Sequence, residues 1–211
     1  LTDRLGEPVV WSGAVKTLRD ARLLAPESPH DPGSLDAHPL VRAHFQDEVR
    51  EDFPAAWQAG NERLFRYLTA LPAKDQPDTL EELRPLYLAI PHGCAAGRHE
   101  NVFWEVLYRR IQRSGAYYSH NLGAFGAELA ALAPFFAPEP PWRQPLPALT
   151  ASARAVVLNQ AAFRLRALGR LAEAVEPMRM AIDAWLEVNH WPGAAANASN
   201  QIGRASCRER V

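Results

Sequence analysis

Residues 157–185 read VLNQAAFRLRALGRLAEAVEPMRMAIDAW and carry the clearest structural pattern in the chain. Apolar residues recur there at intervals of three and four on both sides of Gly169, as they do on the buried faces of two helices. Before Gly169 they are Val157, Ala161, Leu165 and Leu168; after it they are Leu171, Ala174, Val175, Met178, Ala181, Ile182 and Trp185. Glycine ends a helix readily, and alanines let two helix backbones approach closely. The stretch therefore predicts a helical hairpin.

A single hairpin leaves an apolar face uncovered, so the pattern also predicts stacked helical neighbours. Another helix starts near residues 194–200. Earlier, Thr79 and Glu82 form a capping-box pattern at the start of a helix pair over residues 79–113. Ala95–Gly97 is typical of a helix end, and Val102, Val106 and Ile111 indicate the returning helix.

Helical periodicity extends over most of the remaining chain and predicts a mainly α-helical fold. We expect a helix over residues 11–24 capped by Ser12, and helices over 39–49, 54–71 and 120–133. Their expected core-facing residues are Leu40, Phe45 and Val49; then Ala56, Gly60, Leu64, Tyr67 and Leu71; then Leu122, Phe125, Leu129 and Leu132. Three prolines and Gly33 lie between the first two of these helices, where they prevent a continuous helix and favour turns. We therefore expect at most one small β-hairpin, between residues 23 and 38.

Residues 134–147 contain six prolines, a density that no helix interior or central strand tolerates. Because Phe135, Phe136 and Trp142 lie among these prolines, we expect an extended segment whose rings dock on neighbouring helices. A solvated hinge is the alternative.

The composition excludes several classes of protein. Of 211 residues, 47% are hydrophobic and 22% are charged, and the net charge is -1, which argues against disorder and against a strongly basic nucleic-acid binder. No apolar run approaches the ~18 residues of a membrane span. The two cysteines, Cys94 and Cys207, cannot build a disulfide framework, so a reducing, cytoplasmic compartment is expected.

The last ten residues, IGRASCRERV, resemble the translation of a sequencing adapter. They show no helical or strand period, so residues 202–211 are expected to be a non-native tail. A native, frayed basic tail is the alternative. Residue 1 is Leu, and we expect the chain to be a piece of a longer protein.

The predicted hairpin resembles a tetratricopeptide repeat. The matching positions are Leu158, Ala161, Ala162, Leu165, Gly169, Ala174, Met178 and Ala181, whereas Leu186 stands where the family often has proline. The resemblance implies that Asn159, Phe163 and Arg166 face a peptide-binding groove. Their amide, ring and guanidinium suit peptide backbone, an apolar anchor and a carboxylate. A generic hairpin, with Phe163 packed on the preceding helices and Arg166 solvated, is the alternative.

The string LDAHPLVRAHF at residues 35–45 resembles the end of the winged helix in STAND-type (NACHT/NB-ARC-like) signalling ATPases of the bacterial kind. The segments PHGCAAG at 91–97, RRIQ at 109–112 and LGAFG at 122–126 are also similar to such multidomain repeat proteins. The resemblance implies that His38 senses the nucleotide phosphates, with a locally bonded histidine as the alternative. The chain has no Gly-x-x-x-x-Gly-Lys-Ser/Thr loop, so no catalytic residue and no cofactor are expected in it; ATP or ADP would belong to the parent.

These observations predict five parts: a winged-helix-like remnant with a short β-hairpin (1–52), a helical repeat-like region (53–133), a Pro-rich connector (134–149), a tetratricopeptide repeat with the start of the next (150–201) and the tail (202–211). The expected function is a non-enzymatic one in signal transduction, binding a protein or peptide partner and relaying nucleotide state, with oligomerisation possible in the parent. No membrane or direct nucleic-acid contact is expected. A standalone tetratricopeptide adaptor and a transcription regulator whose DNA-binding domain lies elsewhere are the alternatives.

Other chemistry is less favoured. His92, Cys94 and His99 lie close in sequence, but zinc sites need a fourth ligand, so no metal site is expected. Arg109, Arg110 and Arg113 form a basic cluster that we interpret as a solvated face.

Overall fold

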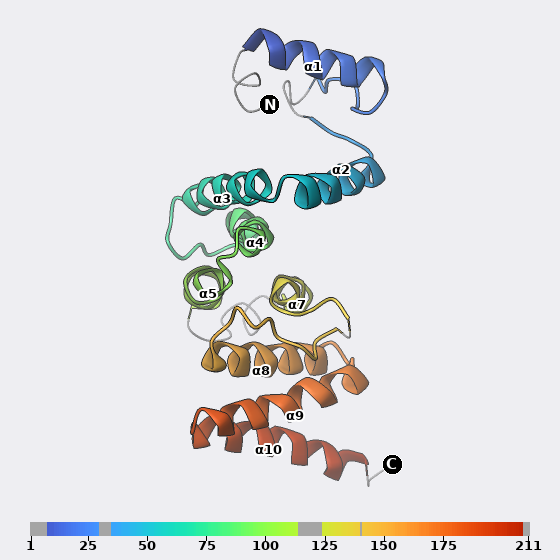
Figure 1. Cartoon of the computed structure of the whole chain (residues 1–211). Helices are drawn as coiled ribbons and strands as arrows, with labels where there is room; N and C mark the ends of the chain where they lie inside the picture. Colours follow the sequence, from blue (N-terminus) through green and yellow to red (C-terminus); the bar gives the residue numbers. More distant parts are fainter. Residues whose placement is uncertain (1–7, 30–34, 114–123, 140, 209–211) are drawn as a thin grey trace. The chain divides into compact units, whose positions relative to one another are not determined.

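The computed structural model describes residues 8–29, 35–113, 124–139 and 141–208, and its architecture is mainly helical (Figure 1). The elements are α1 (Pro8–Asp20), α2 (Pro39–Asp52), α3 (Pro54–Ala70), α4 (Leu80–Ala95), α5 (His99–Asn101), the π-helix η1 (Val102–Ile111), α7 (Phe125–Leu132), the 3-10 helix η2 (Ala133–Phe135), α8 (Ala151–Ala167), α9 (Leu171–Glu187) and α10 (Trp191–Arg208). Within the described ranges no β-strand forms, which confirms the expected helical class.

The chain forms two compact units, residues 1–57 and residues 58–211. The boundary between these units falls inside α3. The finer division into a winged-helix remnant, repeats and a tail stays a prediction.

In the first unit, α1 begins at Pro8, earlier than expected, so Ser12 lies inside the helix and is not its cap. Proline is well suited to a first helical turn because it lacks only an amide that would find no partner there. After α1, the Ala25 amide donates to the Asp36 carbonyl at 2.7 Å. Residues 30–34, the tip of the expected β-hairpin, lie outside the described residues.

Helix α2 exposes the side chains that we expected to face a core. Leu40 is 74% exposed, Phe45 47% and Val49 37%, and none of the residues of α2 is buried. Periodicity shows which residues share a face of a helix, but burial requires a second element against that face. The expectation that these three residues face a core is therefore wrong in this structure.

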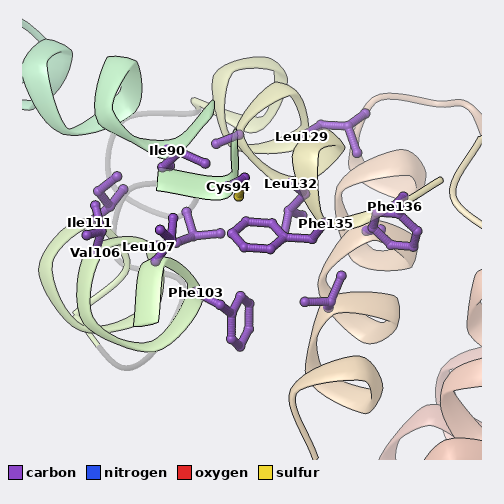
Figure 2. Close-up of a cluster of buried hydrophobic side chains, with 14 of the residues drawn as sticks. Ile90, Cys94, Phe103, Val106, Leu107, Ile111, Leu129, Leu132, Phe135 and Phe136 are labelled. Atoms are coloured by element: carbon purple, nitrogen blue, oxygen red, sulfur yellow. The ribbon is translucent and has the colours of Figure 1, made fainter. Parts of the chain in front are cut away.

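The core of the second unit lies where α4, η1, α7 and α8 meet (Figure 2). Leu83, Leu86 and Ile90 of α4 are fully buried and share one face of the helix. The capping box at the start of α4 also forms, since the Thr79 hydroxyl accepts from the Glu82 amide at 3.2 Å and Glu82 accepts from the Thr79 amide at 3.3 Å.

Helix α3 turns a different face to the core from the one expected. Asn61 and Phe65 are its buried residues, whereas Leu64, Tyr67 and Leu71 of the predicted apolar stripe are exposed. Polar contacts with the end of α4 select this face: Asn61 Oδ1 lies 2.9 Å from His92 Nδ1, and Gln58 Nε2 donates to the Ala96 carbonyl at 3.1 Å. Apolar periodicity cannot detect such contacts.

The returning helix of the first predicted pair is a π-helix. Its hydrogen bonds run five residues back, as in the bond from the Gln112 amide to the Leu107 carbonyl at 2.9 Å. The wider turn brings residues four and five apart onto one face. Val102, Val106 and Ile111 are consequently all buried, as predicted.

The proline-rich segment is docked on the helices, as expected. Phe135 and Phe136 are buried, and Trp142 packs against the same core. An isolated β-bridge between Phe136 and Pro145 folds the segment back on itself, and the Ala137 amide donates to the Gln144 carbonyl at 2.8 Å.

The predicted hairpin forms as α8 and α9. Thr150 caps α8 by accepting from the Ala153 amide at 3.3 Å, and Gly169 adopts a φ of 75° between the helices. Two hydrogen bonds close this turn: Gly169 donates to the Arg166 carbonyl, and Arg170 donates to the Leu165 carbonyl.

The same pair of closing hydrogen bonds ends three other helices. In α1, α4 and α9 the left-handed residue is Arg22, Gly97 and Asn189 respectively. The turns after α1, α4, α8 and α9 therefore share one geometry. After α9 the chain continues as α10, which extends to Arg208 although residues 202–208 show no helical period in the sequence. That residues 202–211 are a non-native tail stays a prediction.

Candidate functional site

The predicted sensor, His38, lines a hollow of about 1010 Å³ in the first unit. The end of α1, the segment after it and the start of α2 line this hollow. Because Arg19, Arg22 and Arg42 line it together with His38, we call it the basic hollow. Asp20, Glu27 and Asp36 supply three carboxylates to the same lining.

His38 is the N-cap of α2. Its Nδ1 accepts from the Leu40 amide at 3.3 Å, so in the neutral ring the proton is on Nε2. Pro39 follows at the first helical position. The ring thus has a local structural role, which is the alternative that the sequence left open, while Nε2 remains a donor. The first amides of α2 are already occupied, since Pro39 has none and those of Leu40, Val41 and Arg42 donate to His38. The start of α2 therefore offers an anion only the partial positive charge of the helix dipole.

Two of the three arginines of the basic hollow have no ion-pair partner within the described residues. Arg19 lies 3.4 Å from Glu27, whereas Arg22 and Arg42 make no such contact. Arg22 also has a φ of 58°, a left-handed conformation that glycine adopts at lower cost. The Arg22 guanidinium is therefore carried by a residue whose backbone conformation glycine would adopt at lower cost.

The predicted groove residues all lie on α8, where Asn159, Phe163 and Arg166 are half-buried. The Phe163 ring is 6.1 Å from the Phe125 ring of α7, so α7 covers part of the expected peptide-binding face. Asn159 and Arg166 are one turn away on either side of Phe163. The structure thus places the three residues on one helix face, and the peptide contact stays a prediction.

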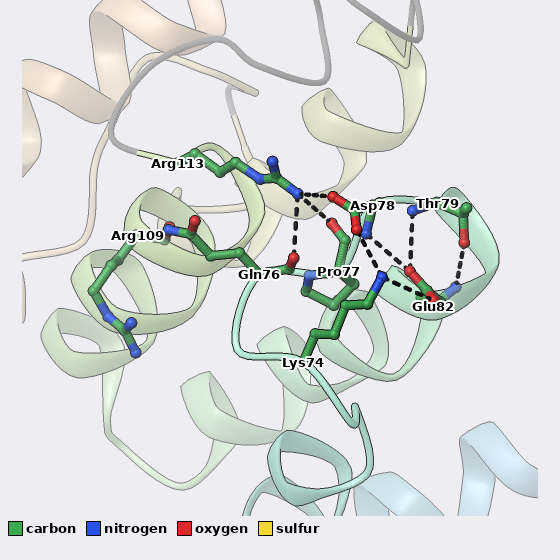
Figure 3. A network of polar contacts seen from close by, with 8 residues as sticks. All are labelled: Lys74, Gln76, Pro77, Asp78, Thr79, Glu82, Arg109 and Arg113. Atoms are coloured by element: carbon green, nitrogen blue, oxygen red, sulfur yellow. Dashed lines mark hydrogen bonds and ion pairs between the residues drawn. The ribbon is translucent and has the colours of Figure 1, made fainter.

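The predicted basic cluster is not a solvated face but a clamp on the loop between α3 and α4 (Figure 3). Arg113 Nη2 donates to the Pro77 carbonyl at 2.9 Å and to Asp78 Oδ1 at 2.7 Å. Arg110 Nη1 donates to the Thr69 carbonyl at 2.8 Å, and Arg109 pairs with Asp75. The sequence could not show this because the partners lie more than thirty residues away.

The histidines and the cysteine considered for metal binding are dispersed. His92 contacts Asn61, and burial lowers the pKa of both His92 and His99. Burial raises the pKa of the Cys94 thiol to about 12, so this thiol is unreactive at neutral pH. In the parts of the chain that the structure describes, no three His, Cys, Asp or Glu side chains come close enough together to hold a metal ion.

A buried ion pair joins α7 to α8, and sequence reasoning missed it. Arg164 donates through Nε to Glu128 Oε2 at 2.7 Å, and the two side chains are 2% and 0% exposed. Arg164 Nη1 also donates to the Gln160 carbonyl at 3.1 Å. Burial lowers the pKa of Arg164, and the Glu128 carboxylate opposes that shift.

A second hollow, of about 790 Å³, lies between α4 and α7, and we call it the apolar groove. Leu80, Glu81, Arg84, Tyr87, Leu88 and Pro91 form its α4 wall, and Ala127, Ala130 and Ala131 form its α7 wall. The α4 residues form a second helical stripe, adjacent to the stripe that faces the core. The sequence does not reveal this groove, because its two walls are more than thirty residues apart in the chain.

Comparisons with models of protein families, with curated proteins and with solved structures found no match for this chain. Of the helices that the structure describes, none has both the length and the hydrophobicity needed to cross a bilayer.

Proposed function

We propose that the chain is a non-catalytic part of a STAND-type signalling ATPase, which responds to nucleotide phosphates in its first unit and binds a protein partner through its helical second unit. The observation that carries the proposal is the basic hollow, which Arg22, Arg42 and the N-cap residue of α2, His38, line together. Guanidinium groups are usual ligands of phosphate oxygens, and the positive end of a helix dipole favours an anion.

The chemistry of the hollow fits a relay role. A phosphate group bound there would add charge-assisted hydrogen bonds in one nucleotide state only and would thereby shift a conformational equilibrium. Because the chain has no Gly-x-x-x-x-Gly-Lys-Ser/Thr loop, the proposal assigns hydrolysis to a separate ATPase domain.

The test measures binding of inorganic pyrophosphate to the chain by NMR titration of backbone amides. We expect the largest shifts at residues 38–42 and at Arg22. The variant Arg22→Gly removes a guanidinium while keeping the left-handed turn, and His38→Asn removes the imidazole while keeping a capping oxygen. Both variants, and Arg42→Gln, are expected to weaken binding several-fold.

Arg63→Gln is the matched control, since Arg63 is exposed on α3 and outside the basic hollow. Equal binding by the native chain and by Arg22→Gly and Arg42→Gln would contradict the proposal. Shifts dispersed over all arginines would also contradict it, because they would indicate nonspecific attraction.

The protein-binding half of the proposal retains Asn159, Phe163 and Arg166 as contact residues on α8. We expect Arg166→Glu to weaken binding of a peptide selected from a displayed library without loss of helix content. Leu165→Ala is the contrast: because Leu165 is fully buried, we expect its truncation to unfold the hairpin. A selected peptide that binds Arg166→Glu as tightly as the native chain would exclude this face.

A further inference from the structure

The apolar groove between α4 and α7 has large, exposed apolar side chains on one wall and small ones on the other. Leu80 and Leu88 are 46% and 49% exposed on its α4 wall, and its α7 wall consists of alanines. Small side chains on one wall allow another helix to approach closely, while the larger residues on the other wall supply contacts. From Leu80 to Pro91 the α4 wall is about 16 Å long, which matches a helix of three turns.

The two charged residues of the groove distinguish one partner from another. Glu81 and Arg84 lie one turn apart on α4, and within the described residues neither has an ion-pair partner. A charge of each sign in a mainly apolar groove is complementary to a ligand that presents the opposite charges in the opposite order. Such complementarity fixes register and direction more than it raises affinity.

We propose that the apolar groove binds an amphipathic helix of another protein, running antiparallel to α4, whose apolar stripe is flanked by an acidic residue and, three or four positions later, a basic residue. The acidic side chain then meets Arg84 and the basic one meets Glu81. Antiparallel packing also sets the helix dipoles favourably, and the order acidic-then-basic stabilises the partner helix itself.

This proposal uses none of the residues on which the proposed function rests, so either can fail without the other. The basic hollow belongs to the first unit, and Asn159, Phe163 and Arg166 lie on α8. The groove lies wholly within residues 80–134 of the second unit.

The test uses two blocked peptides of about fourteen residues, a length of roughly four helical turns. Both carry leucines at positions i, i+3 and i+7, and they differ only in the order of one Glu and one Lys placed four residues apart. Binding to the whole chain is measured by fluorescence anisotropy. We expect the Glu-first peptide to bind about tenfold more tightly than the Lys-first peptide.

The decisive variant exchanges the charges of the groove, Glu81→Lys with Arg84→Glu, and is expected to reverse the preference. Leu88→Glu is expected to abolish binding of both peptides, whereas Leu168→Glu, at a similarly exposed leucine outside the groove, is the control and leaves binding unchanged. Circular dichroism checks that each variant keeps its helix content.

Several results would overturn the proposal. Equal affinity for the two peptides, or a preference that survives the charge exchange, would show that the charges do not select the partner. Absence of binding, or binding that tolerates Leu88→Glu, would exclude the groove. A chain that sediments as a dimer, and as a monomer after Leu88→Glu, would show that a second copy occupies it.

Discussion

At Gly93, α4 packs closely against Val102 and Phe65. A Cβ atom placed there would overlap Val102 and would lie 2.7 Å from the Phe65 ring. We expect Gly93→Ala to lower the free energy of unfolding by about 1–3 kcal/mol, because the packed core must shift to admit a methyl group. Urea unfolding followed by circular dichroism measures this.

Gly60 is the matched control, since a Cβ atom on it would meet no atom within 4 Å. In the middle of α3, Gly60→Ala is expected to stabilise the protein by about 0.5–1 kcal/mol. If the two substitutions changed the free energy of unfolding by similar amounts, α4 would not pack closely against Val102 in solution.

The ion pair between Glu128 and Arg164 predicts a strong asymmetry between single and double substitutions. Because both side chains are buried, Glu128→Leu leaves a cation without its counterion and is expected to cost about 3–5 kcal/mol. The double variant Glu128→Leu with Arg164→Met is expected to recover most of that loss, since an apolar pair needs no counterion. A double-mutant cycle of unfolding free energies checks this; purely additive losses would disprove the coupling.

At the scale of elements, the loop between α3 and α4 depends on charge. Asp78 accepts from Lys74 Nζ at 2.7 Å and from Arg113 Nη2 at 2.7 Å, and these bonds lower the pKa of the Asp78 carboxyl to about 2. A lowered pKa in the folded state means that the stabilisation is complete above the ordinary pKa of ~3.9 and is lost as pH falls through about 2.

Titration of the Asp78 carboxyl carbon by NMR tests this clamp. We expect a midpoint near 2 in the native chain and a higher midpoint, closer to the ordinary ~3.9, after Lys74→Met. In thermal melts, Asp78→Asn is expected to lower Tm at pH 7 and to have progressively less effect as the pH approaches 2. A midpoint that Lys74→Met does not move would show that the lysine contact is absent in solution.

Over the whole molecule, the two units differ in how many of their side chains are buried. No side chain that the structure describes in residues 11–57 is buried, whereas α4, η1 and α8 together supply most of the core of the second unit. Amide hydrogen exchange measures the consequence, since local opening is easiest where few apolar contacts must break. We expect amides of α1 and α2 to exchange at least tenfold faster than those of α4 and α8; equal protection would show that the first unit is covered in solution.

Features formed by residues close together in the chain were predictable from the sequence. The helical class, the capping box at Thr79, the helix end at Gly97 and the hairpin turn at Gly169 each depend on a few neighbouring residues, and each is present. Docking of Phe135 and Phe136 was predictable because apolar rings among prolines have few alternatives to burial on the helices. Of the site residues, only the local arrangement was accessible: His38 at the entry of α2, and Asn159, Phe163 and Arg166 on one face of α8.

Contacts between residues far apart in the chain were decided only by the tertiary structure. The buried face of α3 follows from the contact of Asn61 with His92, the role of Arg113 from Asp78, and the burial of Arg164 from Glu128. The apolar groove likewise exists only because α7 returns beside α4. Periodicity and capping describe how a single segment folds. The contacts named above depend on which segments of the chain pack together, because a polar or charged side chain gains its distant partner only when the two segments meet.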